Sequence, residues 1–521
     1  MHFLLLGHDT FAEPLRRLGH QVTTCSVDPG ADLPVDDPDP DWSLIQRLIR
    51  GRGCQAVLVT DDVGYRQMPC GLWRSELPVA FYGVDSPLNR FWQRPYARLF
   101  DLAWLDQPAE AEDLAAVHPR AQWLPVAVDP ARYQGPPADQ VKDGVCFVGV
   151  VDPRVRPKRS AVLERVARVT PLTVAGGRRG RWVTAEQAAT MYRAHQVVLN
   201  ENLFTGFTTR PLEVMAAGGC LLSEAAPGAM DRCFQHLEHL AYFDGATLEQ
   251  MLRKLLGDAA LRRRLSEQGR AAVLAGHGLE HRAEVIAAAL GEMARTPWDR
   301  RRRLGGGDAL LAEGQALTMA GLRWPAKNGA RRLLRGTGRT AAAASDGADP
   351  CQGPFLAGLG AAARQDHGRA LELLARAARC GGADQRLALG LAAHQAGRPQ
   401  LARQALAPLA AQYPGLEQAP GEAEFHLAAA ALLQDLGRDM RPGFNGAELD
   451  PVLWSALEHL RLVAKQQRDD PRAWQRMGEI LLARGAAWEA HHCLRAALAA
   501  GAGEAAKRRL AQAAQQGFVL P

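Results

Sequence analysis

A chain of 521 residues is too long to enclose one hydrophobic core, and ordinary domain sizes predict about three domains. The hydrophobic content of 47% is typical of a globular protein. The nine cysteines include no C-x-x-C pair, so they indicate neither a zinc site nor a disulfide framework. The net charge of +6 is not accompanied by a nucleic-acid motif, so we expect no binding to nucleic acid. The N-terminus, MHFLLLGHDT, has too few apolar residues for a signal peptide or a membrane span. We therefore expect a cytoplasmic protein without an integral membrane segment.

The first 142 residues alternate short apolar runs with amphipathic segments. Strands are predicted for HFLLLG, QVTTCSV, AVLVT and PVAFYG, and helices for residues 11–18 and 42–49. Alternating strands and helices with Gly-rich turns are typical of a doubly wound parallel sheet, so we expect an α/β, Rossmann-like domain over residues 1–142. Two titratable residues follow predicted strands in this domain, His8 after the first strand and Asp85 after PVAFYG.

A second unit of the same kind is predicted for residues 143–295, with strands at VCFVGVV, PLTVAGG, QVVLN and GCLLS. Its most distinctive segment is NENLFTGFTTRPLEVMAAGG at residues 200–219, which joins one of these strands to an apolar helix. Ligands of parallel α/β sheets bind at the carboxyl ends of the strands, where this loop must lie. Its small residues would let the backbone approach a ligand closely. The sequence therefore predicts a ligand site in this loop.

The loop resembles the sugar-nucleotide loop of retaining GT-B glycosyltransferases, E-G-F-G-x-x-x-L-E-A-M-A-x-G. The matching residues are Gly206, Phe207, Leu212, Glu213, Met215, Ala216 and Gly218. Thr205 stands where that family has its first carboxylate, so the retaining mechanism does not carry over. Asn200 and Arg210 match the CgeB-like branch, the spore-maturation-protein-like glycosyltransferases, more closely. The resemblance implies the GT-B architecture, in which two Rossmann-like domains face a cleft.

The resemblance also implies roles toward a nucleotide-sugar donor. In the family, a basic residue in the first loop of the second domain contacts the phosphates, and the candidates that follow Gly149 are Arg154, Arg156, Lys158 and Arg159. Arg159 matches best. Arg210 is a second phosphate candidate, because an arginine at a helix N-terminus is favourable only beside an anion. Glu213 would bind donor hydroxyls, and further polar contacts are expected from Asn200, Thr208 and Thr209.

The acceptor side of the predicted site lies in the first domain. Asp85 matches an Asp in the family pattern Y-x-x-D-x-P, and it could either take the acceptor proton or cap the following helix. His8 is the second catalytic candidate, because its loop lies at the same edge of the sheet. The acidic run at residues 37–41 is interrupted by prolines and predicts a loop, so we expect a metal-independent mechanism without a cofactor.

These assignments have structural alternatives. Arg210 and Glu213 could form a solvated i, i+3 helix pair, which contributes roughly a few tenths of a kcal/mol. The basic loop at residues 154–159 could simply be solvated, and a lone histidine such as His8 is commonly structural or exposed. In these alternatives the charged side chains are surrounded by solvent, whereas in the donor-site interpretation they face a ligand.

Residues 296–350 are predicted to form a basic linker rich in Gly and Ala. Eleven Lys and Arg against three acids occur between Arg295 and Arg339, so this segment accounts for the positive charge of the chain. It could make peripheral contact with an anionic membrane, touch another domain or nucleic acid, or form a solvated hinge. Apolar spacing indicates a helix over residues 309–322, and the end is expected to be flexible.

Residues 351–518 have the composition and periodicity of helices. The best match to the tetratricopeptide pattern is at residues 471–501, through Trp474, Met477, Gly478, Leu481, Ala490, Leu494 and Ala497. Weaker units lie at residues 358–377 and 390–414, and a third at 422–467 is interrupted by RDMRPGFNGAELD. Stacked repeats would form an array whose concave surface binds a protein partner. The alternative is an unrelated helical bundle.

The sequence as a whole predicts a glycosyltransferase that moves a sugar from a nucleotide-sugar donor to an acceptor. A protein and a cell-surface glycan are both open as acceptors. A second hypothesis is a non-catalytic GT-B-like scaffold whose repeats bind protein partners, which Thr205 favours. A third is a nucleotide-sugar epimerase of the same fold. The sequence does not determine the sugar, the nucleotide base or the stereochemical outcome.

Overall fold

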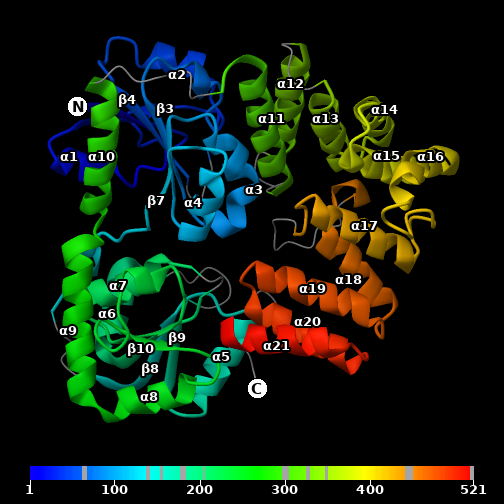
Figure 1. Cartoon of the computed structure of the whole chain (residues 1–521). Coiled ribbons are helices and arrows are strands. Elements are labelled where there is room, and N and C mark those ends of the chain that lie inside the picture. The colour runs from blue at the N-terminus through cyan, green and yellow to red at the C-terminus, as the bar shows by residue number, and fades with distance from the viewer. Residues whose placement is uncertain are drawn as a thin grey trace.

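A computed structural model gives the fold of residues 1–61, 67–136, 141–152, 156–176, 183–202, 206–295, 304–323, 329–345, 350–440 and 450–516. Two α/β domains follow one another along the chain, and a helical region follows them (Figure 1). The structure confirms the predicted fold class, two Rossmann-like domains followed by an all-helical region.

The first domain is built on a seven-stranded parallel sheet in the order β3-β2-β1-β4-β5-β6-β7. Its strands are β1 (His2–Gly7), β2 (Gln21–Ser26), β3 (Leu33–Pro34), β4 (Ala56–Thr60), β5 (Val79–Gly83), β6 (Leu102–Leu105) and β7 (Ala121–Trp123). Its helices are α1 (Ala12–Arg17), α2 (Trp42–Leu48), α3 (Ser86–Ala97) and α4 (Pro108–Ala115). The central strands are apolar throughout because helices cover both faces of the sheet.

The second domain has a five-stranded parallel sheet in the order β12-β11-β10-β8-β9. Its strands are β8 (Lys142–Val148), β9 (Leu172–Ala175), β10 (His195–Asn200), β11 (Leu221–Glu224) and β12 (Ala241–Phe243). Its helices are α5 (Pro157–Ala167), α6 (Ala185–Ala194), α7 (Thr209–Ala217), α8 (Leu248–Gly257), α9 (Ala259–Gly276) and α10 (Leu279–Arg295). Because β8, β10 and β11 are parallel neighbours, their carboxyl ends meet at one edge.

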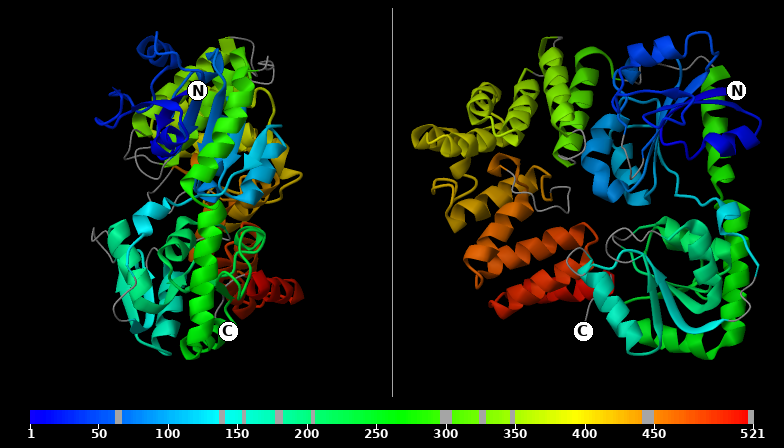
Figure 2. Two further views of the ribbon diagram at one scale, coloured as in Figure 1. Left: turned by 90° about the vertical axis from the view of Figure 1, so that its left-hand side faces the viewer. Right: turned by 180° about the vertical axis from the view of Figure 1, so that it is seen from behind.

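Helix α10 returns to the first domain, although the sequence placed residues 143–295 in the second. Ile286 and Leu290 on α10 are buried in one core with Phe3 and Leu5 of β1, and Arg17 of α1 forms an ion pair with Glu280 at 2.6 Å. Figure 2 shows α9 along the second domain and α10 along the first. The last helix therefore ties the two domains together.

The predicted linker contains two helices, α11 (Gly306–Arg323) and α12 (Ala330–Ser345), where the sequence indicated one helix and a flexible end. Helix α11 packs against α3, and its small residues belong to the core of the first domain: Ala309, Ala312, Ala316 and Ala320. The helix predicted for residues 309–322 is thus confirmed as α11, but its packing against the first domain was not predicted, because small alanines carry little apolar signal and yet allow close helix packing. Arg300 to Arg303 lie outside the described residues.

The basic residues of α12 contact an acidic loop of the first domain. Arg332 binds Asp39, and ion pairs also join Arg331 and Arg335 to Asp37 and Arg339 to Asp41. The described part of the segment is therefore not a solvated hinge. The acidic run at residues 37–41 and the basic residues after 330 are the two halves of one interface.

The helical region continues as antiparallel pairs, which we call the array. The pairs are α13 (Gln352–Ala363) with α14 (His367–Ala378), α15 (Ala383–Gln395) with α16 (Pro399–Ala410), α17 (Ala423–Asp435) with α18 (Ala456–Gln466), and α19 (Pro471–Ala483) with α20 (Ala487–Ala499), followed by α21 (Glu504–Gln516). Three pairs share one close contact at the same spacing, Gly358 with Leu374, Gly390 with Leu406, and Gly478 with Leu494. A Cβ on any of these glycines would lie within 2.7 Å of the leucine Cγ, so the helices can approach only with glycine there.

Part of the array surface is covered by the chain itself. The short 3-10 helix η6 (Pro451–Leu453) follows the insertion that interrupts the third unit, and it packs against α13 and α15. Val452 and Leu453 are buried in the core of the array. Residues 441–449 of the insertion lie outside the described residues. Part of the surface of α13 and α15 is therefore covered by η6.

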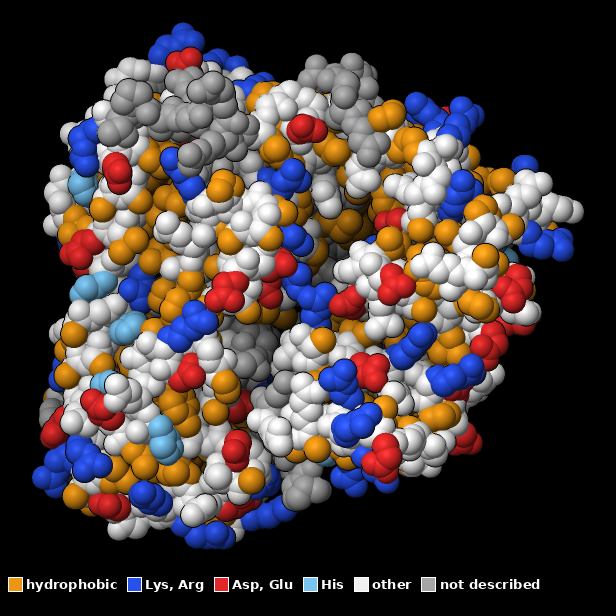
Figure 3. Space-filling model, in the orientation of Figure 1, with side chains coloured by type: hydrophobic (Ala, Val, Ile, Leu, Met, Phe, Trp, Pro, Cys, Tyr) orange, Lys and Arg blue, Asp and Glu red, His pale blue; other side chains and the backbone are white. Residues whose placement is uncertain are grey.

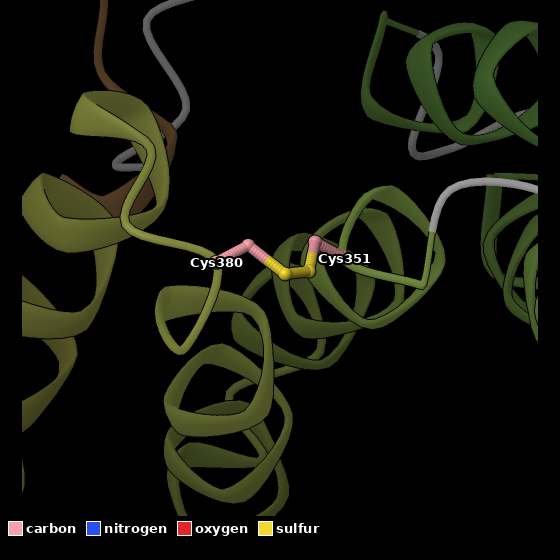
Figure 4. Close-up of a disulfide and its surroundings, with 2 residues drawn as sticks. All are labelled: Cys351 and Cys380. Carbon is pink, nitrogen blue, oxygen red and sulfur yellow. A yellow bond between two sulfur atoms is a disulfide. The ribbon is translucent and has the colours of Figure 1, made fainter.

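A disulfide joins Cys351, at the start of α13, to Cys380, just after α14 (Figure 4). The two Cα atoms are 6.2 Å apart, and 29 residues separate the cysteines in sequence. The sequence predicted no disulfide framework, because the spacing of these two cysteines matches no known disulfide pattern. Only the antiparallel packing of the helix pair brings them together.

A buried histidine pair lies inside the array. The Nδ1 atoms of His426 and His459 are 2.8 Å apart, and the Trp454 ring lies 6.0 and 5.2 Å from the two imidazole centroids. Burial lowers the pKa of His426 to about 4. Burial also lowers the pKa of His459, and the nearby His426 and Arg438 act in the same direction.

We expect the array to lose stability as the pH falls from about 6.5 toward 4. An unfolded histidine takes up a proton near pH 6.5, whereas folded His426 resists protonation down to a pKa of about 4, so acidification favours unfolding. The full shift corresponds to about 3 kcal/mol. Urea unfolding at about pH 7.5 and about pH 5 measures it. His426→Leu should reduce the pH dependence, the exposed His394→Gln should not, and equal curves for both variants would contradict the assignment.

Across the described part of the chain, no helix is both long enough and apolar enough to cross a membrane.

Candidate functional site

A buried network of charges lies where β8, β10 and β11 end. Lys158, near the start of α5, is 2.9 Å from Glu224 and 3.2 Å from Glu201, and Arg159 donates to Glu201 at 2.7 Å. The side chains of Lys158, Glu201 and Glu224 are only 14%, 3% and 6% exposed. Charges this deeply buried are stable only when they are paired.

The electrostatics of this network keep both signs of charge inside it. Burial alone would lower the pKa of Lys158, but Glu224 and Glu201 outweigh it and the pKa is raised. Burial raises the pKa of Glu224, and Lys158 opposes that rise. Lys158 and Arg159 are therefore cations whose charges are already matched by carboxylates.

Polar side chains at the ends of β10 and β11 form a rigid frame around the network. The Asn200 amide donates to Asn202 and to Ser223, each at 2.9 Å. The backbone N–H of Asn202 donates to Glu224 at 2.9 Å. All four residues are buried. Asn200 is thus placed at the strand end as predicted, and its carbonyl oxygen remains to accept a hydrogen bond.

Arg210 uses that oxygen. Its Nη1 donates to Asn200 Oδ1 at 3.1 Å, and its guanidinium carbon lies 5.0 Å from the centroid of the Phe147 ring. Gly149 is close as well, because a Cβ at that position would come within 2.8 Å of Arg210 Nη2. Burial lowers the pKa of Arg210, and the neighbouring Arg159 lowers it further. Among the described residues, no carboxylate forms an ion pair with Arg210.

Glu213 has partners other than Arg210. It accepts a hydrogen bond of 3.5 Å from the Tyr192 hydroxyl, and it also interacts with the Tyr133 hydroxyl. The solvated Arg210–Glu213 pair, the structural alternative from the sequence, is therefore absent from this described helix. Thr208 is the N-cap of α7 without a side-chain cap bond, and Thr209 is exposed.

The first domain meets this site through the turn after β6. The Gln107 side chain accepts from the Phe207 backbone N–H and donates to the Phe207 carbonyl, both at 2.7 Å. Asp106, the preceding residue, is buried and accepts from the backbone N–H groups of Asp85 and Ser86 at 2.9 and 3.1 Å. The carboxylate that caps α3 is therefore that of Asp106, and the Asp85 side chain makes no cap bond.

The two predicted catalytic residues lie in different surroundings. Asp85 is half-buried and close enough to Arg156 of the second domain to act on it: burial and Arg159 lower the pKa of that arginine, and Glu201 and Asp85 oppose the lowering. His8 follows β1 and is exposed, and its ring contacts Thr10 and lies 3.8 Å from Asp9. The contacts favour Asp85 over His8 as a residue of this site.

The array also reaches the site. Trp488 of α20 is buried in the core of the second domain, beside Phe147 and Val162. The next residue, Glu489, interacts electrostatically with Lys158, Glu201 and Glu224. Figure 3 shows acidic and basic side chains gathered where the first domain meets the array.

Sequence reasoning missed several residues of this site, and Arg154 and Thr205 lie outside the described residues. The residues that it missed are Asp106, Gln107, Glu201, Glu224 and Glu489. Glu201 and Glu224 directly follow the predicted strands QVVLN and GCLLS, which was the available signal. In the described part of the chain, no three His, Cys, Asp or Glu side chains are grouped as metal ligands would be. The metal-free mechanism stays a prediction.

Comparisons with known proteins concern mainly the second domain. Residues 156–288 match the family described as glycosyl transferase-like. No curated protein matches the chain. The matched region contains the charged network, Arg210 and Glu213, so the similarity to this family includes the part of the second domain where the site lies.

Solved structures that are similar to part of this chain include the following three. A glycosyltransferase from Rickettsia africae ESF-5 is 9% identical with a TM-score of 0.40, over 57% of this chain and 99% of that one. Anabaena Alr3699/HepE in complex with UDP and glucose is 12% identical with a TM-score of 0.42, over 56% and 100%. Sucrose-phosphate synthase (tll1590) from Thermosynechococcus elongatus is 13% identical with a TM-score of 0.40, over 56% and 99%.

Proposed function

We propose that the chain is a metal-independent, CgeB-like glycosyltransferase that binds a nucleotide sugar at the strand ends of the second domain. The acceptor would lie toward the first domain, near Asp85. The family match over residues 156–288 supports sugar transfer as the general activity. The charged site within that region supports an anionic donor.

The observation that carries this proposal is the state of Arg210. The network contains three cations, Lys158, Arg159 and Arg210, and two buried carboxylates, Glu201 and Glu224. Lys158 and Arg159 form ion pairs with carboxylates, whereas Arg210 hydrogen-bonds to an amide oxygen, and Glu213 and Glu201 act on it without forming an ion pair among the described residues. A partly buried guanidinium with no ion-pair partner favours an anion in contact with it, so we infer that the ligand supplies that negative charge.

The chemistry of glycosyl transfer uses such a charge. The departing nucleotide diphosphate must be neutralised, the anomeric carbon becomes oxocarbenium-like, and the acceptor must be oriented. Arg210 and the free N–H groups at the start of α7 would bind the phosphates. Glu213 would accept hydrogen bonds from donor hydroxyls, and Asp85 would take the acceptor proton.

The acceptor and the location of the protein are further parts of the proposal. The array, as a tetratricopeptide-like region, would recruit a protein acceptor or partner, and the exposed face of the described array beyond η6 is where we place that contact. The basic segment is not needed for membrane contact in its described part, because its arginines bind the first domain. A cytoplasmic location belongs to the proposal.

Arg210→Met is expected to weaken nucleotide-sugar binding by about 10- to 150-fold, because a hydrogen bond to a charged group contributes about 1.5–3 kcal/mol. Titration calorimetry with a panel of nucleotide sugars measures binding, and release of the nucleotide measures turnover.

Arg262→Met is the matched control for this test. Arg262 lies in the same domain, and its guanidinium donates to the Leu255 and Leu256 carbonyls at 2.6 and 2.8 Å, away from the strand ends. Its replacement should leave donor affinity unchanged. Failure of the wild type to bind any nucleotide sugar would refute the proposal. Binding without turnover would support the donor site and leave the acceptor to be identified.

A further inference from the structure

We infer that Asp106 and Gln107 are positioning residues. They link residues 206–208 of the second domain, which precede α7 and which we call the donor loop, to Asp85 of the first domain. The inference rests on the proposed function, because it assigns these residues to the acceptor side of the same reaction. Neither residue belongs to the sequence-predicted site.

The first step of the link is the pairing of Gln107 with Phe207. Phe207 is fully buried in the loop that precedes α7, and both of its backbone polar groups bond to the one Gln107 amide. A side-chain amide that satisfies both groups fixes the loop as a neighbouring strand would. The donor loop therefore takes its position from a residue of the other domain.

The second step joins Gln107 to Asp106. Gln107 Nε2 donates to Asp106 Oδ2 at 3.1 Å, and the same carboxylate accepts from Asp85, from the Ser86 backbone and from the Ser86 hydroxyl. Four donors thus converge on one carboxylate that is 2% exposed. Burial raises the pKa of Asp106 to about 6, and the bonds from Ser86 and Gln107 oppose the rise.

The third step concerns the backbone of Asp85. Its φ of 50° and ψ of 38° lie in the left-handed region, which is uncommon for a residue other than glycine. Such a conformation persists where the surroundings impose it, and it is concentrated at functional sites. The N–H bonds from Asp85 and Ser86 to Asp106 impose it here. The Asp85 side chain is thereby left out of the helix cap and lies near Arg156.

These three steps form a chain of hydrogen bonds from Phe207 through Gln107 and Asp106 to Asp85. A shift of the donor loop therefore acts on the backbone that orients Asp85. Because this series of hydrogen bonds crosses the domain boundary, a change in the distance between the two domains also changes the orientation of Asp85.

Amide hydrogen exchange of the free protein tests the link without a substrate. Gln107→Met removes every hydrogen bond of that amide at similar volume, so exchange should become about five- to tenfold faster at residues 206–209 and also at 85–88. Asp106→Asn should speed exchange at 85–88, because the Asp85 and Ser86 N–H groups bond to different oxygens of Asp106 and the NH2 group that replaces one of them cannot accept. Gln107→Glu keeps the acceptor for the Phe207 N–H, so it should protect 206–209 more than Gln107→Met does.

Glu112→Ala is the control for general loosening between the domains. Glu112 and Arg232 form a largely exposed contact of 3.3 Å between the same two domains, and removing Glu112 leaves Arg232 on the Trp123 ring, whose indole donates to the Asp106 carbonyl. Exchange in both segments should match that of the wild type. Unchanged exchange at 85–88 in Gln107→Met, or an equal rise in Glu112→Ala, would overturn the link.

Kinetics with a donor that the wild type accepts test the positioning role. Asp106→Asn should lower kcat at least tenfold with the donor KM unchanged, whereas Gln107→Met should raise the donor KM as well. Unaltered kcat in Asp106→Asn would overturn the role of Asp106 even if exchange responds. If the wild type turns over no nucleotide sugar, the proposed function fails, and hydrogen exchange still decides whether the link exists.

Discussion

Arg332→Met is expected to destabilise the protein by about 3–5 kcal/mol, because it leaves a buried carboxylate without its counter-charge. The guanidinium of Arg332 binds both oxygens of Asp39 at distances of 2.7 to 3.1 Å, and the two side chains are 2% and 0% exposed. The pair joins α12 to the acidic loop of the first domain. Urea unfolding followed by tryptophan fluorescence measures the transition of that domain, where Trp42 and Trp92 belong to the same core.

The neighbouring residue provides the control. Arg331 pairs with Asp37 at 3.2 Å, but its side chain is 50% exposed and that of Asp37 27% exposed. Water screens such a pair, so Arg331→Met should cost less than about 1 kcal/mol. Equal effects of the two substitutions would show that the charge of α12, rather than the buried pair, stabilises the interface.

This interface shows what sequence reasoning could not supply. The acidic loop at residues 37–41 and the basic residues after 330 were each visible as unusual segments. Almost 300 positions separate them, and no local pattern indicates that they meet. In the same way, the small residues of α11 gave a weak helix signal, although close packing against the first domain requires them.

The sheets were more predictable than the interfaces. Buried parallel strands are short apolar runs between turn residues, so HFLLLG and QVVLN correspond to β1 and β10. The apolar segment AQWLPVAV joins the sheet only over Ala121–Trp123, because apolar residues after a proline can pack without joining a sheet.

The candidate site was predictable in place but not in pairing. Asn200 and Arg210 were expected at a strand end and are hydrogen-bonded there. Their roles toward a donor stay predictions. The sequence could not show that Lys158 and Arg159 face Glu201 and Glu224, because these partners lie 42 to 66 positions away. Which basic residue of the loop at 154–159 contacts the phosphates depends on that pairing.

Lys158→Met is expected to destabilise the second domain by about 3–5 kcal/mol near pH 8, because it leaves Glu224 buried without its cation. The effect should shrink as the pH falls. Burial already raises the pKa of Glu224, and without Lys158 the carboxyl group takes up a proton more readily in the folded state. A raised folded-state pKa contributes stability at low pH that is lost as the pH rises through it. Urea unfolding across this pH range measures both the size and the direction.

The double variant Lys158→Met with Glu224→Gln separates the network from the ligand. It removes one charge of each sign and keeps an oxygen for the Asn202 N–H, so it should recover most of the lost stability. If Arg210 is the residue that binds the anion, the double variant should also keep nucleotide-sugar affinity within about threefold of the wild type. A loss as large as that of Arg210→Met would instead assign the phosphate to Lys158, and it would mean that Glu224 holds that lysine only until the donor arrives.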